Sequence, residues 1–232
     1  MKKNIAENPA SRTSSTAAHD APRDDAENVV GFPRSAKTAK FPPRRRANAE
    51  MRSREFLTRD EVLAIADAAK RSGRNGHRDR LVILTLYRHG FRVAELVRLT
   101  WDDVSFGRSC TMNIRRVKNG TPSTHPLSGD EVRELRQLQR EQDPLSRFVF
   151  CSERGGPLSQ RTAHRIVAAA GETARLAFPV HPHMLRHARG YQLANRGIDT
   201  RAIQAFLGHR RIESTTIYTA LDANRFNGFT ED

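Results

Sequence analysis

The composition of the chain changes near residue 55, and this break decides how much of the 232 residues can form a core. Residues 1–50 hold five of the eleven prolines, many Ser, Thr and Ala residues, only two aromatic residues and no apolar periodicity. Such a segment buries too little apolar surface to offset the entropy lost on ordering. We therefore expect a disordered basic tail over residues 1–54 and one folded domain over residues 55–232.

Helical periodicity dominates the expected domain. The sequence Thr58-Arg-Asp-Glu61 has the form of a capping box and precedes apolar residues at helical spacing. A broadly apolar helix is expected through residues 81–87, ending near Gly90, and a short amphipathic helix over residues 93–99. Further helices are expected over residues 128–142, 159–170, 184–195 and 200–207, and a last short one around Tyr218.

The middle of the domain changes to strand-like patterns. Residues 101–106, 111–117 and 124–127 are typical of short strands, and Asn119-Gly120 indicates a hairpin turn between the last two. The predicted fold class is therefore mainly α with a small antiparallel β-sheet (α+β).

The net charge of +14 and the isoelectric point near 11.0 favour a polyanionic partner. Nucleic acid is the usual partner, and a membrane surface is the alternative. No stretch approaches the roughly eighteen apolar residues of a membrane-spanning helix, and no apolar run that would predict a secretory signal follows the first residues. Cys110 and Cys151 are too few for a disulfide framework, so we expect reduced, buried or half-buried thiols in a cytoplasmic protein.

A dispersed set of polar residues suits phosphodiester cleavage without a metal ion. Tyr218 offers an oxygen nucleophile, but its ordinary pKa of about 10 makes it a poor one unless cations favour the phenolate. Arg92 and Arg186 are candidates for these cations, because guanidinium groups match phosphate oxygens and stay charged. Glu95 lies three residues after Arg92 and could hold its guanidinium, although a purely local salt bridge explains the pair equally well.

Three further residues could complete this pocket. Lys118, beside the hairpin turn, could donate a proton to a leaving oxygen, although a lysine is also ordinary in a turn. His183 and His209 could donate hydrogen bonds or carry protons. An alternative for the histidines around His183 is a metal site, but no cysteine or carboxylate accompanies them at ligand spacing, and nearby arginines would repel a cation. We therefore predict no metal.

The order of these residues resembles that of the tyrosine recombinases, the phage-integrase family. The resemblance covers about residues 55–225 and rests on four motifs: Gly90-Phe-Arg-Val-Ala-Glu-Leu96, Pro182-His-Met-Leu-Arg-His187, Leu207-Gly-His209 and Thr216-Ile-Tyr218. Stretches outside the catalytic set are similar to the fimbrial phase-switch invertases, the Fim-type recombinases: residues 113–120, 181–188 and 223–226.

The resemblance implies a role for each candidate. Tyr218 would attack the scissile phosphate and become a 3′-phosphotyrosine, and Arg92 and Arg186 would stabilise the pentacoordinate phosphorane. Lys118 would protonate the leaving 5′-hydroxyl. The resemblance further implies that His183 and His209 assist proton transfer and that Glu95 supports Arg92. The covalent intermediate would conserve the bond energy, so no cofactor is expected.

The resemblance also implies the partners and the reaction. The partners would be double-stranded DNA, other copies of the chain, as a tetramer on two duplexes, and accessory DNA-bending proteins. The expected reaction inverts a promoter segment between inverted repeats. A type IB topoisomerase-like activity and a DNA-binding regulator without catalysis are the alternatives. Beyond the catalytic set, the arginines expected to contact DNA are Arg44, Arg45, Arg46, Arg115, Arg116 and Arg210.

The sequence departs from the family pattern at its N-terminal end. Most members carry a separate core-binding domain, and residues 1–54 are too short and polar to form one. The Fim-type subgroup lacks that domain too. The basic tail is interpreted either as an arm that follows DNA phosphates or as a solvated linker. Beyond Tyr218, Phe226 and Phe229 are candidates for docking on a neighbouring protomer or packing on their own domain.

Overall fold

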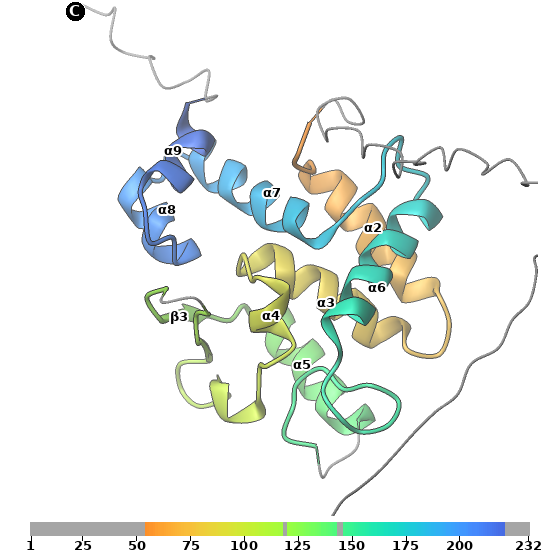
Figure 1. Cartoon of the computed structure of the whole chain (residues 1–232). Helices are drawn as coiled ribbons and strands as arrows, with labels where there is room; N and C mark the ends of the chain where they lie inside the picture. The colour runs from red at the N-terminus through yellow and green to blue at the C-terminus, as the bar shows by residue number, and fades with distance from the viewer. Residues whose placement is uncertain (1–53, 118–119, 143–145, 221–232) are drawn as a thin grey trace, which may run out of the picture. The chain divides into compact units, whose positions relative to one another are not determined.

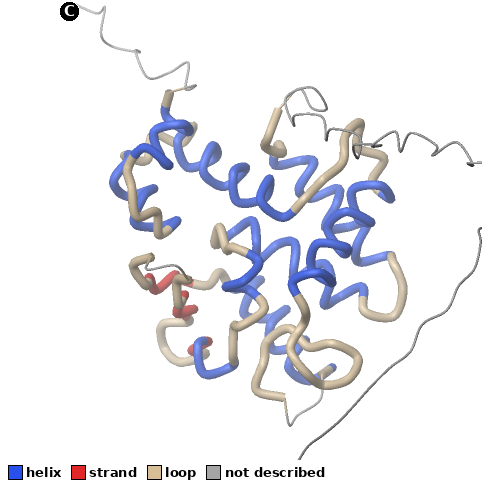
Figure 2. Tube along the Cα trace, in the orientation of Figure 1, coloured by secondary structure: helices blue, strands red, loops and turns tan. Residues whose placement is uncertain are grey.

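The computed structural model describes residues 54–117, 120–142 and 146–220. Helices make up most of these residues, and the strands are short (Figure 2). The helices are α2 (Arg59–Arg71), α3 (Gly76–Arg88), α4 (Val93–Leu96), η1 (Trp101–Asp103), α5 (Gly129–Glu141), α6 (Gln160–Thr173), α7 (Pro182–Ala194), α8 (Thr200–Leu207) and α9 (Glu213–Thr219). The predicted class, mainly α with a small antiparallel sheet, is confirmed.

Side-chain caps fix several helix ends. At the start of α2, the Glu61 backbone N–H donates to Thr58 Oγ1 at 3.3 Å, and the Thr58 N–H donates to Glu61 Oε2 at 2.8 Å. The predicted capping box is therefore present. Asp199 caps α8 by accepting two backbone N–H bonds, and Gly208 ends that helix with φ +66°, a conformation that glycine adopts without strain.

The sheet has the order β1-β2-β3 and is antiparallel throughout, with strands β1 (Val104–Ser105), β2 (Thr111–Ile114) and β3 (Ser123–Pro126). One expectation is wrong, because the predicted strand over residues 101–106 begins with the 3-10 helix η1. The Asp103 carboxylate accepts hydrogen bonds from the backbone N–H and hydroxyl of Thr100, and these bonds favour a tight turn there over an extended strand.

The helices enclose two apolar clusters. The larger lies among α2, α3, α5, α6 and the first half of α7, and includes residues such as Ile65, Leu84 and Met184. The smaller lies where the last turns of α7 meet α8 and α9, which Figure 1 shows gathered at one end of α7. Tyr218 belongs to this second cluster and is 1% exposed. The candidate nucleophile is therefore a core residue in this conformation.

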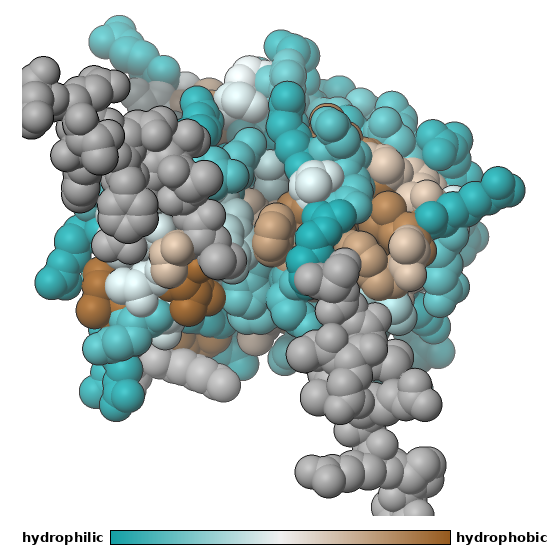
Figure 3. Space-filling view, turned by 90° about the horizontal axis from the view of Figure 1, so that it is seen from above, coloured by the Kyte–Doolittle hydropathy of each residue, from teal (hydrophilic) through white to brown (hydrophobic). Residues whose placement is uncertain are grey.

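The two cysteines lie where the sequence predicted, buried or half-buried. Cys151 is buried, Cys110 is half-buried, and both are free. In the part of the chain that the structure describes, no helix is long and apolar enough to cross a membrane. Hydrophilic side chains cover most of the face in Figure 3, with smaller hydrophobic patches between them.

Some predicted features lie outside the described residues. They are the tail over residues 1–53, with Arg44, Arg45 and Arg46, and the residues Lys118, Asn119, Phe226 and Phe229.

Candidate active site

Arg92 and Glu95 form a local pair at the start of α4. Arg92 Nη1 donates to Glu95 Oε1 at 2.8 Å, and the Arg92 backbone N–H donates to Glu95 Oε2 at 3.0 Å. The Glu95 side chain is fully buried, whereas the Arg92 side chain is 30% exposed. Glu95 therefore contacts Arg92 through both its carboxylate oxygens, and part of the Arg92 guanidinium stays open to a ligand.

Arg116 is buried, and this contradicts its predicted role as a surface contact to DNA. Its side chain is 0% exposed, and Nη1 donates to Glu95 Oε2 at 2.9 Å. Nη2 donates to the Phe206 backbone carbonyl and, at 3.4 Å, to Ser123 Oγ. The residue is therefore an internal tie between the sheet, α4 and the end of α8.

Glu95 is an anion between two cations. Burial raises the pKa of its carboxyl group, but the backbone hydrogen bond from Arg92 and the charge of Arg116 outweigh burial. The net pKa of Glu95 is therefore below its ordinary value, and the group stays ionised at neutral pH. The carboxylate also accepts the Val117 backbone N–H at 3.3 Å, so it joins α4 to the segment that follows β2.

Arg186 lies inside the domain at 1% exposure. Its Nη1 donates to the Gly90 carbonyl and its Nη2 donates to the Leu207 carbonyl at 2.7 Å. Burial and the charges of Arg92 and Arg116 lower the pKa of Arg186 to about 9, so it remains charged at neutral pH. The two carbonyls hold the guanidinium between the loop that precedes α4 and the last residue of α8.

Tyr218 is seated on a glycine in the middle of α7. A Cβ atom on Gly190 would meet Tyr218 Cζ at 2.5 Å and Cε2 at 2.6 Å, so no other residue leaves room for the ring. Tyr191 packs edge-on against the same ring, with centroids 5.1 Å apart. A glycine inside a helix costs about 0.5–1 kcal/mol relative to alanine, and here it makes room for the tyrosine.

The hydroxyl of Tyr218 lies 3.1 Å from Nδ1 of His187. Burial raises the pKa of Tyr218 to about 12, although the positive charge of Arg186 opposes it. Burial also lowers the pKa of His187 to about 4, so this imidazole is neutral at neutral pH. The expectation that nearby cations favour the phenolate is therefore not met in this conformation, because burial outweighs them.

His209 and His183 flank the arginines. His209 follows Gly208, and its Nδ1 lies 2.8 Å from the Thr215 hydroxyl at the start of α9. Burial and the charges of Arg186 and Arg92 lower the pKa of His209 to about 3. His183 lies near the start of α7, where desolvation of its ring and the charge of Arg186 lower its pKa. Arg92, His183, Arg186, His209 and Tyr218 thus share one region, in which the charges of the two arginines act to lower the pKa values of His183, His209 and Tyr218.

The remaining candidates are outside this cluster. Arg210 is exposed, and Arg115 is 76% exposed with its Nε 2.7 Å from Asp103 Oδ1, so both are accessible to DNA. Lys118 lies outside the described residues. Among residues that the structure describes, no group of three or more His, Cys, Asp or Glu side chains could hold a metal ion.

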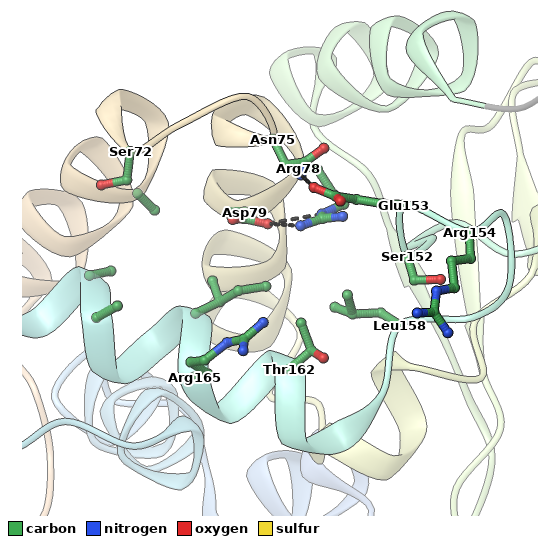
Figure 4. Close-up of a pocket in the computed structure, with 14 residues that line it drawn as sticks. Ser72, Asn75, Arg78, Asp79, Ser152, Glu153, Arg154, Leu158, Thr162 and Arg165 are labelled. Atoms are coloured by element: carbon green, nitrogen blue, oxygen red, sulfur yellow. Dashed lines mark hydrogen bonds and ion pairs between the residues drawn. The ribbon is translucent and has the colours of Figure 1, made fainter.

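A hollow of about 660 Å³ lies elsewhere, between α2, α3, α6 and the loop near residue 153 (Figure 4). It contains none of the predicted catalytic residues. Arg78, which lines it, already donates to Asp79 Oδ1 at 2.7 Å and to the Cys151 carbonyl at 2.9 Å. Its guanidinium therefore serves the fold, and the hollow is not the candidate active site.

Comparison with known proteins decides the family. The family model described as "Phage integrase family" matches residues 55–225. The chain belongs to the phage integrase family. It is a tyrosine recombinase, an enzyme that cleaves and rejoins DNA.

Two curated relatives are similar over most of their length. The chain is 44% identical to the type 1 fimbriae regulatory protein FimE of Escherichia coli strain K12, over 78% of this chain and 93% of that protein. It is 41% identical to the type 1 fimbriae regulatory protein FimB of the same strain, over 78% and 91%. The predicted resemblance to the fimbrial recombinases is therefore confirmed.

Solved structures of the family share the fold. The crystal structure of XerA recombinase matches with a TM-score of 0.63 and 28% identity, over 74% of this chain and 62% of that one. A lambda integrase tetramer bound to a Holliday junction matches with a TM-score of 0.54 and 26% identity, over 67% and 47%.

The structure adds residues that the sequence did not single out. His187 received no catalytic role from the sequence, yet its Nδ1 lies 3.1 Å from the Tyr218 hydroxyl. Gly190 and Thr215 also received no role from the sequence. Gly190 makes room for the Tyr218 ring, and the Thr215 hydroxyl contacts His209. A glycine inside the helical pattern of α7 was the one available signal, since such a position needs a packing reason.

Proposed function

We propose that this recombinase inverts a DNA segment between two inverted repeats and so switches a promoter, with Tyr218 as its nucleophile. The similarity to two fimbriae regulatory proteins over nearly their whole length supports inversion. The gathering of Arg92, Arg186, His209 and Tyr218 in one region supports the assignment of the catalytic residues, and it is the observation that carries the proposal.

The proposed chemistry is a transfer of the phosphodiester bond to the protein. Tyr218 Oη attacks the phosphorus, the bond from phosphorus to the 5′-oxygen breaks, and Lys118 gives that oxygen a proton. Arg92 and Arg186 bind the non-bridging oxygens, where negative charge grows. His183 and His209 hydrogen-bond the phosphate, and one of them takes up the proton that the Tyr218 hydroxyl loses on attack. The reverse attack by a 5′-hydroxyl rejoins the strand, so no energy source is needed.

The Tyr218 ring has to move out of its packing site on Gly190 before its hydroxyl can attack the phosphate. With the ring 1% exposed and a pKa of about 12, about one molecule in 10⁵ would carry the phenolate at pH 7. We therefore infer that α9 shifts away from Gly190 when DNA binds, which exposes the hydroxyl to the arginines. His187 holds the hydroxyl until that shift.

DNA is the substrate, and the proposal extends to how it is held. Arg115 and Arg210 are exposed and available to phosphates, and Arg44, Arg45 and Arg46 would add contacts from the tail. Inversion by this chemistry needs four active sites, and the tetrameric lambda integrase complex supports an assembly of that kind. Accessory DNA-bending proteins, and action in the cytoplasm on chromosomal DNA, complete the proposal.

A plasmid assay separates inversion from its rivals. A supercoiled plasmid carrying the inverted repeats that flank the gene should give the inverted segment with the unaltered enzyme and none with Tyr218→Phe. Relaxation of plasmids that lack the repeats would favour a topoisomerase-like activity. Binding to the repeats without any strand exchange would favour a regulator that has lost catalysis.

A further inference from the structure

Two short segments of the chain hold the arginines of the candidate active site. One is residues 90–95, here called the entry segment, which contains Arg92 and the start of α4. The other is the last turn of α8. Arg186 joins them, because its Nη1 donates to the Gly90 carbonyl and its Nη2 donates to the Leu207 carbonyl at 2.7 Å. The separation of the two segments therefore decides where the Arg186 guanidinium lies relative to that of Arg92.

Arg116 makes a second bridge between the same two segments. Its Nη1 donates to Glu95 Oε2 in the entry segment at 2.9 Å, and its Nη2 donates to the Phe206 carbonyl in the last turn of α8. Phe206 immediately precedes Leu207, so Arg116 and Arg186 bind adjacent carbonyls of one helix end. Each guanidinium uses one Nη atom on each segment. A change in the separation of the segments would therefore strain both bridges.

The end of α8 fits closely around the Arg116 side chain. A Cβ atom on Gly208 would meet Arg116 Nε at 2.6 Å and Cδ at 2.9 Å, and Gly208 has φ +66°, which glycine adopts without strain. The Arg116 side chain is fully buried, as is the carboxylate that it contacts. A buried ion pair adds little net stability over apolar residues of similar volume. Stability alone therefore does not account for an arginine at this position.

Arg116 is coupled to both arginines of the candidate site through shared partners. Glu95 accepts from Arg116 at Oε2 and from Arg92 Nη1 at Oε1, at 2.9 Å and 2.8 Å, so one carboxylate serves both guanidinium groups. The coupling to Arg186 runs through the shared helix turn. A guanidinium has more N–H donors than the two that these carbonyls occupy, so Arg186 keeps donors for a phosphate. Arg116 itself is buried away from the surface that DNA would meet.

We propose that Arg116 is a positioning residue that sets the separation of Arg92 and Arg186, so that both guanidinium groups reach the non-bridging oxygens of one phosphate. The proposal rests on the function assigned above, in which these two arginines stabilise the phosphorane. Arg116 does not touch DNA. It fixes the distance between the entry segment and the end of α8, and a misplacement of about 1 Å in such a site can cost about 100-fold in rate.

Arg116→Lys separates the bridge from the charge. Lysine keeps the positive charge that the buried Glu95 carboxylate needs, so the variant should fold. Its ammonium group is a point charge on a flexible stem and not a planar fork, so it does not fix the distance between Glu95 and the Phe206 carbonyl. The variant should therefore lose the positioning role and keep the ion pair.

The chain offers a matched control in Arg78. This arginine also joins a carboxylate to a backbone carbonyl, since its Nη2 donates to Asp79 Oδ1 at 2.7 Å (Figure 4) and its Nη1 donates to the Cys151 carbonyl at 2.9 Å. It lines the hollow that contains none of the predicted catalytic residues. Arg78→Lys therefore makes the same chemical change at a bridge that is separate from the candidate active site.

A methylphosphonate substrate isolates the role of the arginines. A methyl group replaces one non-bridging oxygen of the scissile phosphate, so the group is neutral before attack and carries less negative charge in the pentacoordinate state. It therefore depends less on cations than the natural phosphate does. The rate of covalent complex formation is measured on nicked duplexes with either group. Both stereoisomers at phosphorus are tested, and the one on which Arg92→Ala recovers more is used for comparison.

We expect Arg116→Lys to slow cleavage of the natural phosphate by at least about tenfold, less than the roughly 100–1,000-fold cost of removing one such donor. On the methylphosphonate, its rate should come within about threefold of the unaltered enzyme. Arg78→Lys should change neither rate. A general loss of folding would slow both substrates equally, so the difference between them reports the positioning role.

The outcomes separate the inference from the function on which it rests. If Arg92→Ala is equally slow on the phosphate and on both methylphosphonate isomers, Arg92 does not stabilise the phosphate charge, and the inference falls with that assignment. If Arg92→Ala recovers but Arg116→Lys is equally slow on both substrates, or is not slow at all, the positioning role alone is wrong. Arg116→Met, which fills the space of the arginine stem, gives the same test should Arg116→Lys not fold.

Discussion

Replacing Gly190 with alanine should expel Tyr218 from the domain. An added Cβ would lie 2.5–2.7 Å from three atoms of the ring, closer than van der Waals contact allows. The α7 backbone cannot yield easily, because Gly190 lies well inside the helix. The ring must therefore leave, and α9 must leave with it.

The size of the effect follows from the burial of the ring. A buried tyrosine removes about 150–250 Å² from water. At about 25 cal/mol per Å², that burial contributes about 4–6 kcal/mol. Alanine at a helix interior recovers up to about 1 kcal/mol, so the docking of α9 should weaken by about 3–5 kcal/mol.

Nitration of tyrosine, mapped by mass spectrometry, measures this release. A loss of 3 kcal/mol or more should speed modification of Tyr218 at least about 100-fold, with Tyr87 as an internal reference. Gly171→Ala in α6 is the matched control, because its added Cβ would meet Val180 Cγ2 at 2.8 Å and would not meet Tyr218. An unchanged Tyr218 nitration rate in a folded Gly190→Ala variant would refute the argument that the glycine seats the nucleophile.

Three further predictions concern charge. Glu95→Gln should lower the free energy of unfolding in urea by about 3–5 kcal/mol, because Arg116 would stay buried without its anion. Adding Arg116→Met to the Glu95→Gln chain should restore part of that loss, and a double variant with no restoration would contradict the pairing. Because burial lowers the pKa of His125 to about 3, its unfolded form takes up a proton first, so stability should fall from pH 6.5 towards pH 4 by up to about 1.4 kcal/mol per pH unit. His125→Phe should make that acid limb shallower, and an unchanged slope would contradict the assignment. Alanine at all of residues 44–46 should lower the salt dependence of DNA affinity by up to about three units of slope if each contacts a phosphate, and an unchanged slope would leave the tail a linker.

Local signals predicted the elements well. The Thr58–Glu61 capping box and the Gly208 stop are short-range features, and the helix predicted over residues 200–207 has those bounds in the structure. The 3-10 turn at residues 101–103 escaped prediction, because the Asp103 side-chain bonds to Thr100 compete with an alternating pattern that also fits a strand.

The burial of Arg116 and of Tyr218 depends on long-range contacts, which the sequence alone did not predict. Arg116 looks like a surface charge beside Arg115, but its partners are Glu95, 21 residues before it, and Phe206, 90 residues after it. No local pattern distinguishes the two adjacent arginines. The order of the motifs predicts one shared site for their polar residues, whereas the burial of Tyr218 depends on how α9 packs on α7.

The central claim is that Tyr218 forms the bond to DNA. A duplex nicked near the cleavage site loses a short fragment after cleavage, so the covalent complex accumulates. Digestion and mass spectrometry should then find the 3′-phosphate on the peptide that contains Tyr218, and Tyr218→Phe should give no complex. A complex that persists in Tyr218→Phe, or a phosphate found on Tyr87 or Tyr191, would contradict the account.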